Sequence, residues 1–344
     1  MLTLSVTLTE IGGNMRFITL KMVAERARVS VNTASRAINN KPDINLETKK
    51  RVLKIAKELG YIRNAAAVAL RTKKTGTIGV VIADNRNPFY AEVLNGMEEA
   101  AREKNYHIIL ANTQRDYRKE EEAINLLLAK RVDGLLIAPV QGKDDDIKNL
   151  INANIPFVIV GRDFENINVD AVYNDEINGG FLATEYLIKK GHKKIAFING
   201  FLYKSPARSR LEGYEKALKK YEIPFNDTLV SIGDIDVEDG YERTKQMMEK
   251  NLDFAAIFAY NDMMAFGAMR AIKEKGLRIP EDIGLAGYDD IPFSSLIKPS
   301  LTTVKVKKQD LGVESVKLLL SRINGSRKKI KKIMLDVELV VRET

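Results

Sequence analysis

The pattern of apolar and polar positions near the start of the chain predicts two short helices joined by a tight turn, within residues 19–39. Apolar residues repeat there at helical spacing: Leu20, Val23, Ala24 and Ala27 in the first helix, and Ala34, Ala37 and Ile38 in the second. Thr19 and Ser30 stand where N-cap residues are expected. The arrangement is typical of a helix-turn-helix, whose second helix enters the DNA major groove, although an ordinary helix pair in a core would share it.

A third helix is expected from Leu46 to Leu59, because Asn45 can cap its start and Gly60 can end it. The pattern predicts that its buried stripe holds Val52, Leu53, Ile55, Ala56 and Leu59. Its other face is rich in lysine, which is usual for a solvated surface and also suits contact with phosphate. An alanine-rich helix over residues 64–70 follows, and it is too short to be stable without a partner.

From Thr77 onward, apolar strands alternate with amphipathic helices. Strands this apolar indicate parallel sheets covered on both faces, so the fold class is α/β with two doubly wound lobes and a cleft between them. Strands are expected over residues 78–83, 108–111, 134–140, 157–161, 194–199, 228–232, 255–260, 284–288 and 333–341. Helices are expected over residues 88–104, 119–130, 146–153, 176–190, 210–220, 238–249, 263–275 and 308–323. Ligands of such folds bind at the carboxyl ends of the strands.

These elements predict four parts of the chain. Residues 1–14 are expected to be an unstructured extension, with Met15 as the functional start. Residues 15–62 form the helix-turn-helix domain, residues 63–76 a short helix and linker, and residues 77–344 the two-lobed ligand-binding domain. Its first lobe is expected to hold about residues 77–174 and 306–325, with residues 301–306 crossing back to it. Its second lobe is expected to hold about residues 175–305 and 330–344.

Charge is distributed unevenly along the chain. The first 75 residues hold 15 basic and 5 acidic side chains, whereas the remainder holds 40 and 41. A compact basic module on a near-neutral body is typical of a nucleic-acid-binding head. The chain has no cysteine and two distant histidines, so we expect no disulfide, metal or cofactor site. It also lacks G-x-x-x-x-G-K, G-x-G-x-x-G and a run of about 18 apolar residues, so neither an enzyme nor a membrane protein is expected.

Taken together, the motifs resemble those of the lactose/galactose-repressor (LacI/GalR) family of bacterial transcription factors over residues 18–344. Each motif alone is weak, but their order and spacing are specific. They are residues 19–24, 29–30, 35–36, 60–61, 64, 78–80, 87–90, 130–134, 191–193, 210, 213–214, 261–262 and 284–290. The resemblance implies a cytoplasmic homodimer that represses transcription from a pseudo-palindromic DNA operator.

For the head, the resemblance implies base contacts from Val31, Asn32 and Arg36. Phosphate contacts are implied for Ser30, Thr33 and Ser35. Asparagine pairs with adenine and arginine with guanine, whereas valine can only touch a thymine methyl. The helix over residues 64–70 resembles a hinge helix that enters the minor groove, with Asn64, Ala67 and Leu70 at the family's contact positions. Arg63 and Val68 depart from the usual motif, which leaves the operator geometry open.

For the lobes, the resemblance implies a small-molecule effector bound in the cleft, with a carbohydrate as the first candidate. The implied contact residues are Phe89, Tyr90, Arg162, Arg210, Asn261 and Asp289, with Lys204 and Arg208 as weaker candidates. Carboxylate, guanidinium and aromatic groups suit the hydroxyls and the apolar face of a sugar. The alternatives are that Asn261 and Asp289 only cap local structure, that the effector is a nucleobase or nucleoside or acts as a corepressor, or that the chain is a solute-binding receptor.

Overall fold

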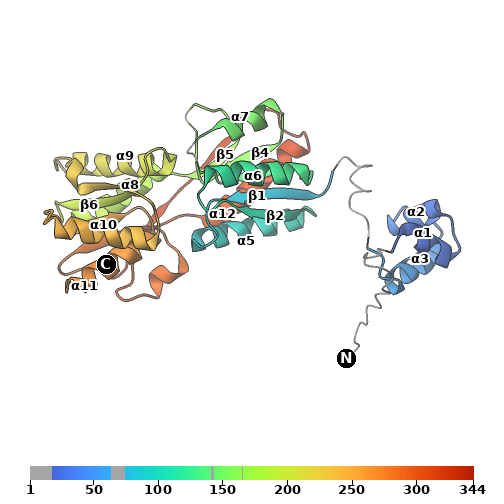
Figure 1. Cartoon of the computed structure of the whole chain (residues 1–344), viewed down its shortest axis with the longest axis horizontal. Coiled ribbons are helices and arrows are strands. Elements are labelled where there is room, and N and C mark those ends of the chain that lie inside the picture. The colour runs from blue at the N-terminus through green and yellow to red at the C-terminus, as the bar shows by residue number, and fades with distance from the viewer. Residues whose placement is uncertain (1–17, 63–73, 141–142, 165) are drawn as a thin grey trace. The chain divides into compact units, whose positions relative to one another are not determined.

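The computed structural model describes residues 18–62, 74–140, 143–164 and 166–344 (Figure 1). The chain forms two compact units, Met1–Thr75 and Gly76–Thr344, and each is described by itself below. Within the described residues, no helix is both long and apolar enough to cross a membrane.

The first unit contains three helices: α1 (Leu20–Ala27), α2 (Val31–Ile38) and α3 (Leu46–Glu58). Both predicted caps form, because Thr19 Oγ1 accepts a hydrogen bond from the Met22 amide and Ser30 Oγ accepts one from the Thr33 amide. Arg28 turns the chain between α1 and α2 in the left-handed region, with φ at 54°. The core is small and is made of Val23, Ala24, Ala27, Ala34, Ala37, Val52 and Ala56.

Three positions of α3 test the predicted buried stripe. Val52 and Ala56 are buried as expected, but the prediction for Leu53 is wrong, because its side chain is 43% exposed. Leu53 lies next to Val52 in sequence, and the α-helix turns consecutive side chains about 100° apart. Gly60 follows the helix with φ at +67°, a conformation that glycine adopts without strain.

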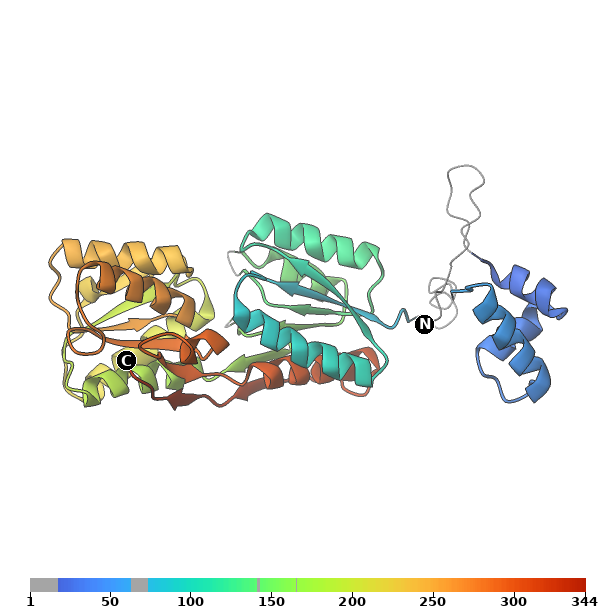
Figure 2. The same cartoon turned by 90° about the horizontal axis from the view of Figure 1, so that it is seen from below.

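The first lobe is built on a six-stranded parallel sheet with the order β11-β5-β4-β3-β1-β2. Helices α5 and α12 pack on one face, and α6 and α7 pack on the other (Figure 1). Figure 2 shows α12 lying alongside α5. The bounds are β1 Thr77–Ile82, α5 Pro88–Glu103, β2 His107–Asn112, α6 Tyr117–Ala129, β3 Leu135–Ile137, α7 Asp145–Asn152, β4 Phe157–Val160, β5 Ala171–Asn174, α12 Lys308–Ile323 and β11 Lys332–Leu335.

The second lobe has a six-stranded sheet with the order β12-β10-β9-β8-β6-β7, in which only β12 runs antiparallel to its neighbour. Helices α8 and α9 cover one face, and α10 and α11 cover the other. The bounds are α8 Glu176–Lys189, β6 Ile195–Gly200, α9 Ser205–Lys220, η1 Asp227–Leu229, β7 Val230–Gly233, α10 Val237–Glu249, β8 Ala256–Ala259, α11 Asp262–Glu274, β9 Gly284–Asp289, η2 Pro292–Ser295, β10 Thr302–Lys305 and β12 Glu338–Val340.

The structure corrects the predicted end of the chain. The single strand expected over residues 333–341 is two strands, because β11 pairs with β5 in the first sheet and β12 pairs with β10 in the second. Residues 332–335 therefore belong to the first lobe, not the second. Residues 302–305 pair with β9 before the chain crosses, and β5 was not predicted at all. The fold class itself, a helical head followed by two mostly parallel α/β lobes, is confirmed.

Glycine allows the helices of the second lobe to pack at backbone contact. A Cβ atom on Gly213 of α9 would lie 2.1 Å from the Ile177 carbonyl oxygen of α8. A Cβ atom on Gly267 of α11 would lie 1.9 Å from the Val237 carbonyl oxygen of α10. These contacts fix the starts of α8 and α10 against α9 and α11, and Glu176 and Val237 at those starts line the cavity described below.

Candidate functional site

A cavity of about 400 Å³ lies between the two lobes, at the carboxyl ends of their strands. The volume is within the usual range of about 300–1,000 Å³ for small-molecule sites. All six residues that the sequence nominated line it: Phe89, Tyr90, Arg162, Arg210, Asn261 and Asp289. Their side chains have very different environments, so each is considered in turn.

Phe89 and Tyr90 begin α5, where Asn87 caps the helix and Pro88 occupies its first turn. Their rings meet edge to face, with centroids 5.2 Å apart and planes at 86°. Phe89 packs against the apolar cores of both lobes, and burial raises the pKa of Tyr90. The pair forms the aromatic wall of the cavity.

Arg210 is committed to a buried ion pair. Its Nε lies 2.7 Å from Glu176 Oε2, and both side chains are less than 10% exposed. The guanidinium also lies 3.5 Å from the ring centroid of Tyr288 and donates to the Tyr260 carbonyl oxygen at 2.5 Å. Burial alone would lower the pKa of Arg210, but the Glu176 carboxylate more than offsets this and the pKa is raised. Arg210 therefore organises the floor of the second lobe while one side of it faces the cavity.

Asp289 ends β9 with φ at 104°, which directs its side chain into the cavity from a left-handed backbone conformation. Burial raises the pKa of Asp289 to about 8, against the opposing attraction of Arg210. Lys308 Nζ donates to the main-chain oxygens of Asp289 and Asp290, both at 2.7 Å, and so holds this turn in place. No described residue makes a hydrogen bond to the Asp289 carboxyl group, which leaves it available to a ligand hydroxyl.

Asn261 is engaged on both sides of its amide. Its Oδ1 accepts from the Met264 amide at 2.8 Å and caps α11, and its Nδ2 donates to the Ile235 carbonyl oxygen at 3.2 Å. Asn261 is thus the N-cap of α11, which was the alternative role considered for it from the sequence. A contact between Asn261 and a ligand stays a prediction.

Arg162 follows β4 directly after Gly161, and its side chain is buried. Its Nη1 donates to the Val140 carbonyl oxygen at 3.1 Å. Beside it, the Asp163 amide donates to Ser205 Oγ at 3.2 Å, which ties the end of β4 to the start of α9 across the two lobes. This contact brings Arg162 and Lys204 to the same side of the cavity.

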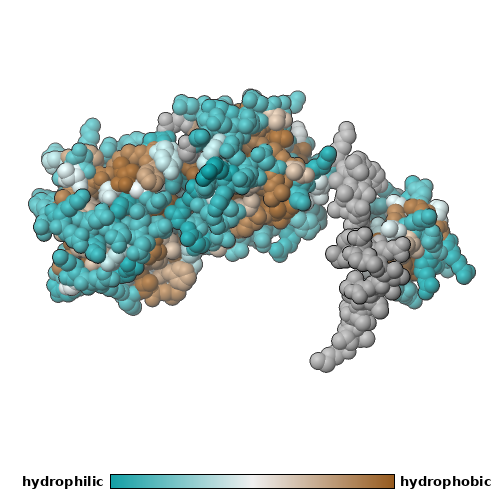
Figure 3. Space-filling model, viewed as in Figure 1, coloured by the Kyte–Doolittle hydropathy of each residue, from teal (hydrophilic) through white to brown (hydrophobic). Residues whose placement is uncertain are grey.

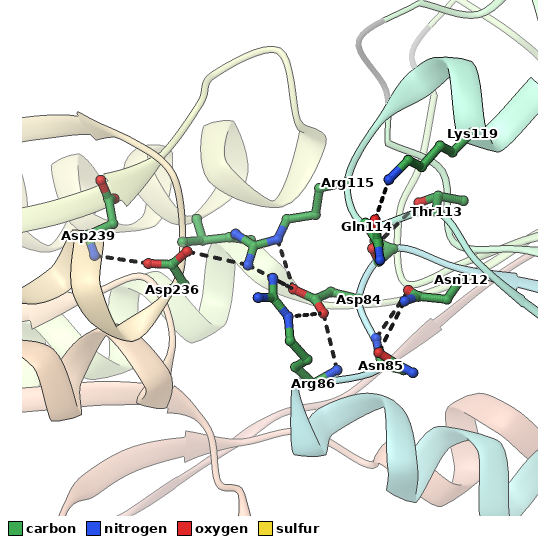
Figure 4. A network of polar contacts seen from close by, with 12 residues as sticks. Asp84, Asn85, Arg86, Asn112, Thr113, Gln114, Arg115, Lys119, Asp236 and Asp239 are labelled. Carbon is green, nitrogen blue, oxygen red and sulfur yellow. Dashed lines mark hydrogen bonds and ion pairs between the residues drawn. The ribbon is translucent and has the colours of Figure 1, made fainter.

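Sequence reasoning missed an ionic network at the same cavity (Figure 4). Asp84 accepts from Arg86 Nη2 and from Arg115 Nη2, both at 2.8 Å, and hydrogen bonds from Arg86 hold the pKa of Asp84 well below its ordinary value. Arg115 also lies 3.6 Å from Asp236 Oδ2. Since Asp236 caps α10 in the second lobe, the network joins the two lobes. Asp84 and Arg115 follow β1 and β2, so the carboxyl-end rule could have found them.

In the head, the start of α2 is open to solvent: the side chain of Val31 is 46% exposed, and Asn32 is exposed too. Arg36 forms an ion pair with Asp43 in the loop after α2, and both side chains are about half exposed. The three hydroxyl residues have local partners: Ser30 Oγ and Thr33 Oγ1 are 2.8 Å apart, and Ser35 Oγ accepts from Asn39 Nδ2 at 3.3 Å. Asn64, Ala67 and Leu70, with Arg63 and Val68, lie outside the described residues.

In the described part of the chain, no group of three or more His, Asp or Glu side chains lies close enough to hold a metal ion. Burial lowers the pKa of His192, and this histidine contacts Gly284 in the second lobe. His192 is thus a packing residue of that lobe.

An exposed recognition-type helix on a small basic head, followed by two α/β lobes around a ligand-sized cavity, defines the class of ligand-responsive DNA-binding regulators. Two family models match: bacterial regulatory proteins of the lacI family over residues 19–64, and the periplasmic binding proteins and sugar binding domain of the LacI family over residues 75–343. The chain belongs to the LacI family of bacterial transcriptional regulators.

Known relatives agree with this assignment. The chain is 37% identical over 327 residues to the transcriptional repressor PurR of Pasteurella multocida, which covers 95% of this chain and 98% of the relative. It is 35% identical, with the same coverage, to the ribose operon repressor of Haemophilus influenzae. These relatives are repressors, so the chain is a DNA-binding transcriptional repressor and not an enzyme.

Solved structures show the same architecture. The lac repressor dimer bound to operator and the anti-inducer ONPF has a TM-score of 0.86 at 32% identity, covering 96% of this chain and 99% of that one. The regulator CelR in complex with cellobiose has a TM-score of 0.75 at 32% identity, covering 95% and 99%. A LacI-family regulator from Enterococcus faecium with bound ribose has a TM-score of 0.69 at 32% identity, covering 78% and 97%.

Proposed function

We propose that this repressor is controlled by a small carbohydrate bound in the cavity between its lobes. The observation that carries the proposal is the mixture of groups around one cavity. The Asp289 carboxyl can accept from or donate to hydroxyls, the buried cation Arg162 can donate to them, and Phe89 with Tyr90 offers an apolar wall. A sugar presents hydroxyls that both donate and accept, together with an apolar ring face, so it matches this set.

The similar proteins support two kinds of effector. The ribose operon repressor and the structures with cellobiose and ribose favour a carbohydrate. A nucleobase or nucleoside is the second candidate, and the identity of 36–37% to several repressors named PurR is the observation that favours it. Either kind of effector can act as an inducer or as a corepressor. Whether operator affinity falls or rises depends on whether the effector prefers the arrangement of the lobes that weakens DNA binding or the one that permits it.

The effector would act through linkage. If it prefers an arrangement of the lobes that separates the two hinge segments of a dimer, it weakens operator binding, and operator binding weakens effector binding by the same factor. The hinge residues Asn64, Ala67 and Leu70 would contact the minor groove in the DNA-bound state.

We propose that the repressor is a homodimer on a pseudo-palindromic operator in the bacterial cytoplasm. Within the first lobe, the apolar side chains of Ile109, Leu110 and Leu126 are each more than 40% exposed on β2 and α6, and Figure 3 shows apolar residues over this part of the lobe. Val31, Asn32 and Arg36 of each head would read bases in one half-site, with Ser30, Thr33 and Ser35 near phosphate.

A thermal-shift panel of the full-length chain tests the effector assignment. The panel compares monosaccharides, disaccharides, sugar acids, sugar phosphates and purine bases. Binding is detected as a rise in melting temperature, because a ligand at about 100 times its Kd stabilises the folded state by about 2.7 kcal/mol. A carbohydrate is expected to raise the melting temperature of the wild type and of Asp227→Ala, whose exposed carboxylate lies on η1, but not of Asp289→Ala. A response to purine bases alone would replace the proposal with the second candidate.

A further inference from the structure

Lys204 is a buried cation without a carboxylate partner. Its side chain lines the cavity and is only 2% exposed. Among the residues that the structure describes, its Nζ contacts only aromatic rings, at 5.6 Å from the centroid of Tyr203 and 6.0 Å from that of Phe201, and no carboxylate lies within ion-pair distance. Lysine is almost never fully buried unless it is paired, because the cost of desolvating its charge is high. The missing partner is therefore expected to be a ligand.

The surroundings of Lys204 add positive rather than negative charge. Burial, together with repulsion from Arg162 and Arg115 and against attraction from Asp234, lowers the pKa of Lys204 to about 8. Lys204 is also the N-cap of α9, a 16-residue helix with no side-chain cap and no acidic residue in its first turn. The amides at such a helix start carry a partial positive charge.

The carboxylates around the cavity do not form an ion pair with Lys204, and Asp234 attracts it only from beyond ion-pair distance. Glu176 is paired with Arg210 inside the second lobe, and Asp84 is paired with Arg86 and Arg115. Asp289 has its pKa raised to about 8 by burial, so it is largely protonated at neutral pH. Among the described residues, the Lys204 ammonium thus keeps no carboxylate within ion-pair distance.

We propose that the effector is an anionic carbohydrate, a sugar acid or a sugar phosphate monoester, whose oxyanion is bound by Lys204 beside Arg162 and the start of α9. The proposal rests on the proposed function, since it places the hydroxyls of the same ligand against Asp289. A neutral sugar would leave the Lys204 ammonium unpaired in the closed cavity, whereas a carboxylate or phosphate oxygen would form a charge-assisted hydrogen bond with it. Carboxylate and phosphate share this chemistry, and the test separates them.

Calorimetric titration of the full-length protein compares each neutral sugar with its charged derivatives. The probes are D-glucose with D-glucuronate and glucose 6-phosphate, D-ribose with ribose 5-phosphate, and inorganic phosphate and hypoxanthine as further arms. At least one charged derivative is expected to bind tenfold or more tightly than its neutral parent, the range of a charge-assisted hydrogen bond. The titrations are made at pH 6.5, because the pKa values of Lys204 and Asp289 are both about 8 and at this pH Lys204 is charged while Asp289 is neutral.

Two substitutions locate the effect. Lys204→Gln and Lys204→Met are expected to lower the affinity for the charged derivative at least tenfold and to leave the affinity for the neutral parent within about twofold. Lys219→Gln is the matched control, because Lys219 lies on the same helix with an exposed side chain. If the Lys204 variants do not fold, the wild-type affinities decide the question: each charged derivative is compared with its neutral parent, and equal affinities overturn the anion assignment.

The outcomes separate this inference from the proposed function. Neutral sugars that bind as tightly as their charged derivatives would overturn the anion assignment and leave the carbohydrate assignment standing. A charged sugar that binds equally well to Lys204→Gln would overturn the role of Lys204. Binding of hypoxanthine alone, of phosphate alone, or of no probe at all would contradict the carbohydrate assignment and the inference together.

Discussion

The buried pair Glu176–Arg210 provides a sharp test of how the second lobe is held together. We expect Glu176→Gln to destabilise this lobe far more than an exposed ion pair would. The two side chains are 7% and 5% exposed and lie 2.7 Å apart. Removing the carboxylate leaves a guanidinium buried between aromatic rings without a counter-charge, and breaking such a pair costs about 3–5 kcal/mol.

The structure narrows that range. Arg210 keeps its hydrogen bond to the Tyr260 carbonyl oxygen and its contacts with the rings of Tyr260 and Tyr288, and glutamine retains an oxygen that accepts a hydrogen bond. We therefore expect a loss of about 3 kcal/mol, at the lower end of the range. Arg210→Met should lose a similar amount, and the double variant should lose less than the sum, because it leaves no unpaired charge.

Urea unfolding of the full-length variants, followed by circular dichroism, measures these losses. Glu212→Gln is the matched control, since its partner Lys216 lies one turn away on the exposed face of the same helix α9. An exposed pair contributes about 0–1 kcal/mol, so this control should unfold almost as the wild type does. If Glu176→Gln is no more destabilised than Glu212→Gln, the reasoning about the buried pair is refuted.

Three further predictions follow from other contacts. Asp236→Asn removes the ion pair with Arg115 between the lobes, so small-angle scattering of the ligand-free protein should show a wider average separation of the two lobes. Because Asp236 is about half exposed, the expected change in the free energy of lobe closure is under about 1 kcal/mol. An unchanged scattering profile would contradict this prediction. Burial raises the pKa of Glu120 from its ordinary value of 4.5 to about 8. The stability that the protonated Glu120 carboxyl contributes is therefore complete below pH 4.5 and is lost as the pH rises toward 8. Urea midpoints should therefore fall over that interval in the wild type and fall less in Glu120→Gln, and parallel curves for the two proteins would count against this. Asp43→Asn frees Arg36 from its ion pair, so DNA affinity measured by fluorescence anisotropy should rise severalfold, whereas an unchanged or weaker affinity would mean that the pair does not compete with DNA.

Local sequence rules predicted the elements well because each of their signals lies within one turn or one strand. The side chains of Thr19, Ser30 and Asn45 accept the first amides of their helices as expected. The division of residues 332–340 between two sheets could not be predicted in this way. Both β11 and β12 are edge strands, and their partners β5 and β10 are more than 30 residues away, so only the assembled lobes decide where each strand pairs.

The candidate site was predicted less completely than the fold. The carboxyl-end rule and the family resemblance predicted that Arg162 and Asp289 line one cavity. No local pattern indicated that Glu176 would form an ion pair with Arg210, or that the Asn261 amide would hydrogen-bond both to the start of α11 and to the Ile235 carbonyl oxygen. The lack of an ion-pair partner for Lys204 among the described residues could not be predicted from the sequence either, because it depends on which carboxylates of other elements already have partners.

The central claim is that a ligand in the cavity controls operator binding. It is tested most directly by measuring the Kd of full-length protein for an operator duplex, selected from random sequences, with and without the carbohydrate identified by thermal shift. We predict at least a fivefold change of Kd in the wild type and none in Asp289→Ala at the same ligand concentration, since allosteric couplings amount to about 1–3 kcal/mol. The account is contradicted if the ligand saturates the wild-type cavity by calorimetry and the operator Kd does not change.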